Sequence, residues 1–159
     1  MENLRHLLLP YNSSKPIWFG HRFKKFSKQG YMSGGAGYVL SQAAVKKFVE
    51  EALQDPKKCR ADGKGAEDAE LGKCLDKVGV IAMDSRDEKE RGRFFPMAPD
   101  NHLISGKIGS KHWFWNYTFY DEKNGMNCCS DTAISFHYIT PAKMTELEYF
   151  IYNVRLAQT

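Results

Sequence analysis

Hydrophobic side chains recur every three or four residues in four segments of the chain, the spacing that places them on one face of an α-helix. These segments cover residues 2–9, 42–53, 67–78 and a final stretch that opens at Pro141. Ser41 and Thr140 stand directly before two of them and are suitable N-cap residues, because a hydroxyl oxygen can accept hydrogen bonds from the amides of the first turn. Gly79 predicts the end of the third helix.

Short apolar runs between these segments predict strands. The runs cover residues 17–19, 80–83 and 134–139. The densely charged segment 84–93 predicts a loop, which Pro96 and Pro99 continue, and the aromatic run 113–120 is compatible with either an extended or a partly helical structure. Helices that alternate with short strands predict an α/β fold. No internal repeat or linker divides the chain, so we expect one domain over residues 1–159.

The composition and net charge of the chain exclude several classes of protein. Of the 159 residues, 42% are hydrophobic and 26% charged, which fits a folded domain rather than a disordered chain. The net charge of +4 is too small to indicate the dense basic face typical of nucleic-acid binding. No run approaches the roughly 20 apolar residues of a membrane span, and no leader pattern opens the sequence.

The cysteines and two glycosylation motifs favour the secretory pathway. Cys59 and Cys74 bracket a polar loop, and a disulfide between them would close a loop of about 15 residues. The adjacent Cys128 and Cys129 fit no zinc-binding spacing. Asn12-Ser13-Ser14 and Asn116-Tyr117-Thr118 are candidate N-glycosylation sites, and glycosylation and disulfides both belong to that compartment.

Two features are candidates for chemistry: a glycine-rich segment, and the acidic residues that open the predicted helix at 67–78. The glycine-rich segment 33–37 is either a structural turn or a loop whose backbone can approach a sugar closely, because glycine has no Cβ. Glu67 and Asp68 either complement the helix dipole or supply a general base, Asp68 being the candidate. Neither alternative is excluded by spacing alone.

Three further side chains have two possible roles each. His137 lies in an aromatic strand, where it is either a satisfied core residue or a metal ligand. Trp113 and Trp115 are either core residues or a platform for the apolar face of a sugar. No spacing indicates a Ser-His-Asp or Cys-His catalytic arrangement.

Three segments together resemble one enzyme family. They are KQGYMSGGAGYVLS at 28–41, GAEDAELGKCL at 65–75 and CCSDTAISFHY at 128–138. In this order they closely resemble the core 1 β1,3-galactosyltransferases, the Fringe-related glycoprotein-N-acetylgalactosamine 3-β-galactosyltransferases of glycosyltransferase family 31. Residues 84–87 and the aromatic run 113–120 also resemble that family, so the resemblance extends over the whole chain.

The resemblance implies a fold, a reaction and a location. It implies the C-terminal part of a GT-A fold, with the nucleotide-binding half before it missing. The reaction would be inverting transfer of galactose from UDP-galactose to O3 of GalNAc on Ser or Thr of a glycoprotein, with Mn²⁺ as cofactor. The location would be the lumenal side of the Golgi membrane, in a type II membrane protein that pairs with a full-length transferase or with a second copy.

The same resemblance assigns roles to individual residues. Asp68 would be the catalytic base and His137 a metal ligand, while Gly34, Gly35 and Glu67 would bind the donor sugar. Trp115 would face the acceptor sugar.

Two departures from the family qualify these expectations. The Asp-x-Asp motif that holds the metal and UDP would precede Glu2, so this chain alone is expected to transfer little or no galactose. His21 stands where the family usually has cysteine, which predicts one unpaired thiol if that cysteine normally joins Cys128 or Cys129. A noncatalytic chaperone or binding relative of an active transferase is therefore the alternative function, and a soluble sugar-binding module is a third.

Overall fold

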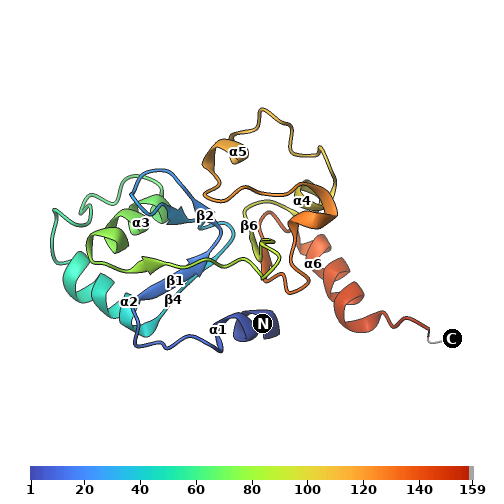
Figure 1. The fold of residues 1–159 in the computed structure, drawn as a ribbon, viewed down its shortest axis with the longest axis horizontal. Coiled ribbons are helices and arrows are strands. Elements are labelled where there is room, and N and C mark those ends of the chain that lie inside the picture. Colours follow the sequence, from blue (N-terminus) through green and yellow to red (C-terminus); the bar gives the residue numbers. More distant parts are fainter. Residues whose placement is uncertain (158–159) are drawn as a thin grey trace.

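The computed structural model describes residues 1–157 and has a mixed α/β fold, as the alternation of patterns predicts (Figure 1). Its helices are α1 (Glu2–Leu8), α2 (Gln42–Lys47), α3 (Glu67–Lys77), α4 (Pro99–Leu103), α5 (Trp113–Tyr117) and α6 (Pro141–Glu148). The π-helical segments η1 (Phe48–Ala52) and η3 (Tyr149–Asn153) continue α2 and α6, and η2 (Gly125–Cys128) is a 3₁₀ helix.

The largest sheet has β1 (Ile17–Gly20) at its centre. One neighbour is β4 (Tyr38–Leu40), which runs antiparallel with Phe19 opposite Val39, and the other is β5 (Ile81–Ala82), which runs parallel. Two further pairs lie beside this sheet: β2 (Arg22–Phe23) with β3 (Tyr31–Met32), antiparallel, and β6 (Phe94–Phe95) with β7 (Ser135–Phe136), parallel.

A side-chain amide occupies the free edge of β5. Gln29 Nε2 donates to the Val80 carbonyl at 2.6 Å, and its Oε1 accepts from the Ala82 amide at 2.8 Å. These are the two kinds of bond that a neighbouring strand would make. Gln29 therefore blunts an edge that would otherwise present unpaired backbone groups.

Helix starts follow the predicted caps. Ser41 Oγ accepts from the Ala44 amide at 3.1 Å, and Thr140 Oγ1 accepts from the Lys143 amide at 3.2 Å. The predicted apolar face of the helix at 42–53 is only partly buried: Ala44 is inaccessible, whereas Val45 and Val49 are each 46% exposed. The local pattern thus predicts the helix and where it begins, but not how much of its apolar face is buried.

Two elements in the predicted loop after residue 93 differ from expectation. Phe94 and Phe95 form β6, and Pro99 opens α4 instead of continuing the loop. Proline is favoured at the first helical position, where its missing N–H has no intrahelical partner to lose. Phe95 stacks on Phe136 across the β6–β7 pair, with ring centroids 4.5 Å apart.

The main core lies between α3, the central sheet and α5. Its fully buried side chains include Trp18, Met32, Leu75 and Phe114. By contrast, α6 and η3 contribute no buried residue and extend away from the rest of the chain (Figure 1). Within the described residues, no helix is both long and apolar enough to cross a membrane.

Both pairs of cysteines form disulfides. Cys59 is joined to Cys74, the pair that the spacing predicts, and Cys128 is joined to its neighbour Cys129. The expectation of one unpaired thiol is wrong, because each of the four cysteines has a sulfur partner. Because Cys128 and Cys129 bond to each other, neither requires a cysteine at position 21 as its partner.

The His21 side chain is a buried, neutral imidazole. Its imidazole stacks on Phe114, and Nδ1–H donates to the Phe94 carbonyl at 3.1 Å. Burial lowers the pKa of His21 to about 3, and the nearby His102 acts in the same direction. The Glu122 carboxyl lies 3.9 Å from Nδ1, and burial raises its pKa to about 7 although Arg86 opposes the shift. The contact is therefore not an ion pair at neutral pH.

We expect Glu122→Gln to stabilise the chain above neutral pH. The folded-state pKa of Glu122 lies above the unfolded value, so its contribution to stability is present at low pH and is lost as pH rises through about 7. At about pH 8 the substitution should raise the free energy of unfolding by about 3 kcal/mol, and this difference should vanish near pH 4. Urea unfolding of both proteins across this range measures the difference. The exposed Glu88→Gln is the control, and a gain independent of pH would contradict the assignment.

A count of free thiols tests the pairing of Cys128 with Cys129. The denatured, unreduced chain should not react with a thiol reagent, and peptide mapping should recover Cys128 and Cys129 on a fragment that is lighter than its dithiol form by the two thiol hydrogens and is not linked to another peptide. Recovery of Cys128 or Cys129 as an alkylated thiol would show that the pairing is wrong.

Candidate active-site cleft

The glycine-rich segment 33–37 forms the turn between β3 and β4. The Ser33 amide donates to the His21 carbonyl at 2.8 Å, and the Gly37 amide donates to the Gly34 carbonyl at 3.0 Å. Gly37 has φ +79°, a conformation that residues with a Cβ rarely adopt. The turn is thus fixed at both ends and presents Gly34 and Gly35 to the neighbouring elements.

Asp68 lies in the first turn of α3 and is held by this turn. Its Oδ2 accepts from the Gly34 amide at 2.9 Å, while Oδ1 accepts from the Ala69 amide at 2.8 Å. A carboxylate is favoured at a helix N-terminus, where the backbone amides point toward it. Two backbone amides therefore orient the candidate base.

Glu67 precedes Asp68 but its side chain turns to the other side of the helix start. Glu67 Oε1 accepts a hydrogen bond from the Tyr38 hydroxyl. Burial and this bond both raise the pKa of Tyr38, so the hydroxyl remains a donor. Glu67 does not line the cleft that contains Asp68, and its predicted role in binding the donor sugar remains a prediction.

His137 reaches the same turn from the opposite side. Its amide donates to the Phe95 carbonyl at 3.0 Å directly after β7, which places the ring over Gly35. A Cβ built on Gly35 would lie 2.1 Å from His137 Nδ1, far inside van der Waals contact. Position 35 must therefore be glycine for the imidazole to occupy this place.

A cleft of about 360 Å³ brings these groups together. It is lined by Phe23, Tyr31, Ser33, Gly35, Asp68, Pro96, Trp113, Tyr117, His137 and Tyr138. Burial and the neighbouring Asp68 carboxylate raise the pKa of Tyr31 to about 12. The cleft thus combines one carboxylate, one imidazole and a wall of aromatic rings.

Of the two tryptophans in α5, Trp113 lines the cleft and Trp115 does not. The Trp115 indole N–H donates to the Gly109 carbonyl at 3.0 Å, and its ring packs on the main core. Positions two apart on a helix face different directions, so only one of these rings can point into the cleft. Trp113, which is 47% exposed, is therefore better placed to contact a ligand.

The remaining predicted positions lie outside the cleft. Asn12 and Asn116 are both exposed, as glycosylation would require. Tyr31 and Tyr138 line the cleft but are not among the predicted site residues. Tyr31 lies within the segment 28–41 that carries the family resemblance, and Tyr138 directly follows His137.

The residues that the structure describes do not provide a complete set of metal ligands. Among residues 1–157, no three His, Cys, Asp or Glu side chains cluster closely enough to hold a metal ion. His137 offers a single imidazole, whereas Mn²⁺ prefers several oxygen-rich ligands. The residues present therefore do not fit a Mn²⁺ site on their own.

Comparisons with known proteins show similarity to one class of enzymes. No protein-family model matches it. It is 33% identical over 84 residues to a mouse β-1,3-glucosyltransferase, which covers 50% of the chain and 16% of that protein, and 32% identical over 84 residues to the human one. It is also 49% identical over 156 residues to glycoprotein-N-acetylgalactosamine 3-beta-galactosyltransferase 1 of Xenopus laevis. By sequence, the chain is thus similar to proteins named as β1,3-linked glycosyltransferases.

Within this class the relationship is specific. The match to the Xenopus protein covers 98% of the chain and 42% of that relative's length. This similarity over nearly the whole chain confirms the resemblance carried by the three sequence segments. It spans less than half the length of this relative.

Gly35→Ala should disrupt the cleft. Its Cβ would overlap the His137 ring, so either the ring or the turn must move, at a cost of about 1–3 kcal/mol in the free energy of unfolding. Thermal unfolding and the chemical shifts of the His137 ring would report both effects. Gly109→Ala is the control, since a Cβ there meets no atom within 4 Å. Equal behaviour of the two variants would contradict the contact between Gly35 and His137.

Proposed function

We propose that this chain forms the acceptor-side part of an inverting β1,3-galactosyltransferase. The reaction is transfer of galactose from UDP-galactose to O3 of a GalNAc carried on Ser or Thr of a glycoprotein. The observation that carries the proposal is the cleft in which Asp68, Gly35 and His137 meet beneath aromatic rings. The name of the Xenopus relative supports the choice of donor and acceptor sugars.

In this proposal Asp68 acts as the general base. Inversion by a single displacement needs one group to take the proton from the attacking O3 hydroxyl as it bonds to the anomeric carbon. The Gly34 amide holds Oδ2 of Asp68 toward the cleft, so the carboxylate is oriented before the acceptor arrives. The exposed ring of Trp113 offers a flat surface for the apolar face of the GalNAc.

The donor side of the reaction is only partly represented. His137 is the one residue we propose as a ligand of the Mn²⁺ that the family resemblance implies, and no step is assigned to the ion because the described residues do not complete a site for it. We assign the protein to the lumenal side of the Golgi, which agrees with two disulfides and two exposed sequons.

A noncatalytic role as a chaperone or binding subunit is the second candidate. The incomplete metal-ligand set and the exposed apolar side chains of α6 and η3 favour it. Copurification with a full-length transferase, with no loss of its binding on Asp68→Asn, would support this alternative.

A chimera tests the catalytic proposal. The 156 matched residues of the Xenopus relative are replaced by this chain, and galactose transfer to a GalNAc-threonine peptide is measured. Asp68→Asn should lower kcat by about 10²–10⁴-fold with little change in KM for the peptide, because the amide cannot accept the proton. Asp76→Asn, at the other end of the same helix, should retain activity. An active chimera that tolerates Asp68→Asn would refute the role of Asp68.

A further inference from the structure

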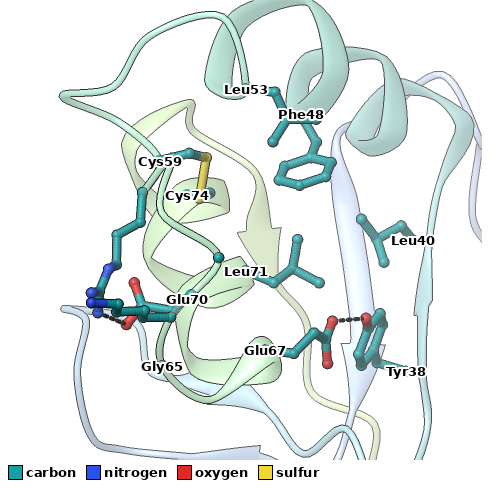
Figure 2. A pocket seen from close by; sticks show the side chains of 13 residues that line it. Tyr38, Leu40, Phe48, Leu53, Cys59, Gly65, Glu67, Glu70, Leu71 and Cys74 are labelled. Atoms are coloured by element: carbon teal, nitrogen blue, oxygen red, sulfur yellow. Dashed lines mark hydrogen bonds and ion pairs between the residues drawn. A yellow bond between two sulfur atoms is a disulfide. The ribbon is translucent and has the colours of Figure 1, made fainter.

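A second hollow of about 460 Å³ opens on the other side of the start of α3 (Figure 2). Its walls are the apolar side chains of Leu40, Phe48 and Leu71, with Leu53 at the mouth. The Cys59–Cys74 disulfide holds the segment after η1 against α3 and so keeps the hollow in shape. Its size lies within the range of ligand sites and far above the voids that packed interiors leave.

Most of the polar groups at the rim of this hollow are paired with other side chains. The Tyr38 hydroxyl bonds to Glu67, and the Arg60 guanidinium donates to Asp62 and lies 3.7 Å from Glu70. The two acidic neighbours raise the pKa of Arg60, with Asp62 the main cause. Since most rim charges already have partners, we expect the main gain from filling the hollow to come from burying apolar surface.

The hollow lies next to the proposed acceptor cleft, because consecutive residues line the two. Glu67 lines the hollow and the next residue, Asp68, lines the cleft. A Cβ on Gly34 would lie 3.3 Å from both Glu67 Oε2 and Asp68 Cβ, so the turn touches both side chains. Consecutive Cα atoms are about 3.8 Å apart, so the two linings meet within one residue step at the start of α3.

We propose that this hollow binds an apolar side chain, of leucine or phenylalanine size, in the polypeptide that carries the acceptor sugar. The inference rests on the proposed function and extends it from the sugar to the peptide. It makes Leu53, Phe48 and Leu71 determinants of acceptor sequence preference.

Glycopeptide binding tests the proposal. The probes are peptides with GalNAc on one threonine, in an alanine and glycine background, with a single leucine placed in turn at each position on either side. At one position or one side, leucine should tighten binding to the 159-residue chain roughly tenfold over alanine, the scale expected for burying one such side chain. Leu53→Gln should remove most of this preference without unfolding the chain, because Leu53 is 51% exposed.

Val49→Gln is the matched control, since Val49 is a similarly exposed apolar residue of η1 that does not line the hollow. It should keep the full leucine preference. Sugar-dependent binding with no leucine preference, or with a preference that survives Leu53→Gln, overturns the subsite and leaves the proposed function standing. Equal binding of glycosylated and unglycosylated peptides overturns the proposed function and this inference with it.

Discussion

The close approach of the Gly34–Gly35 backbone to two side chains is the constraint on which the cleft depends. Asp68 bonds to the amide of Gly34, and the imidazole of His137 occupies the space that a side chain at position 35 would need. The second contact requires glycine at position 35, because a Cβ there would enter the imidazole. One turn therefore sets the position of two groups that are 69 residues apart in the chain (137 − 68).

The start of α3 divides the surface into two environments. Asp68 faces a cleft with aromatic walls, whereas Glu67 faces the hollow and is bonded to Tyr38. Adjacent helix positions point in different directions, so one pair of carboxylates serves two cavities. This arrangement separates the residue proposed to move a proton from the residues proposed to select the peptide.

Features that depend on neighbouring residues could be predicted from the sequence, and those that depend on distant partners could not. Ser41 caps its helix through a bond within one turn, so the local pattern was sufficient. Phe94 and Phe95 are a strand because Ser135 and Phe136 lie beside them, which no local pattern reveals. The resemblance indicates Asp68, His137 and Trp115 as site residues. Asp68 and His137 do line the cleft, but only the geometry of α5 shows that Trp113, and not Trp115, faces it. The bond between Cys128 and Cys129 does not follow from the resemblance, which implies a cysteine partner at position 21.

The pairing of β6 with β7 also makes the site depend on a contact between distant segments. The β1–β4 pair and the Ser41 cap join residues within about one hairpin and one helix of each other, whereas β6 and β7 close a loop from Phe94 to Ser135. Loop-closure entropy rises with separation, so ordering this loop costs more than ordering a hairpin. His137 directly follows β7, so the place of its ring over Gly35 depends on that closure. Loss of the β6–β7 pairing would leave a packed helix and turn without the imidazole that completes the cleft.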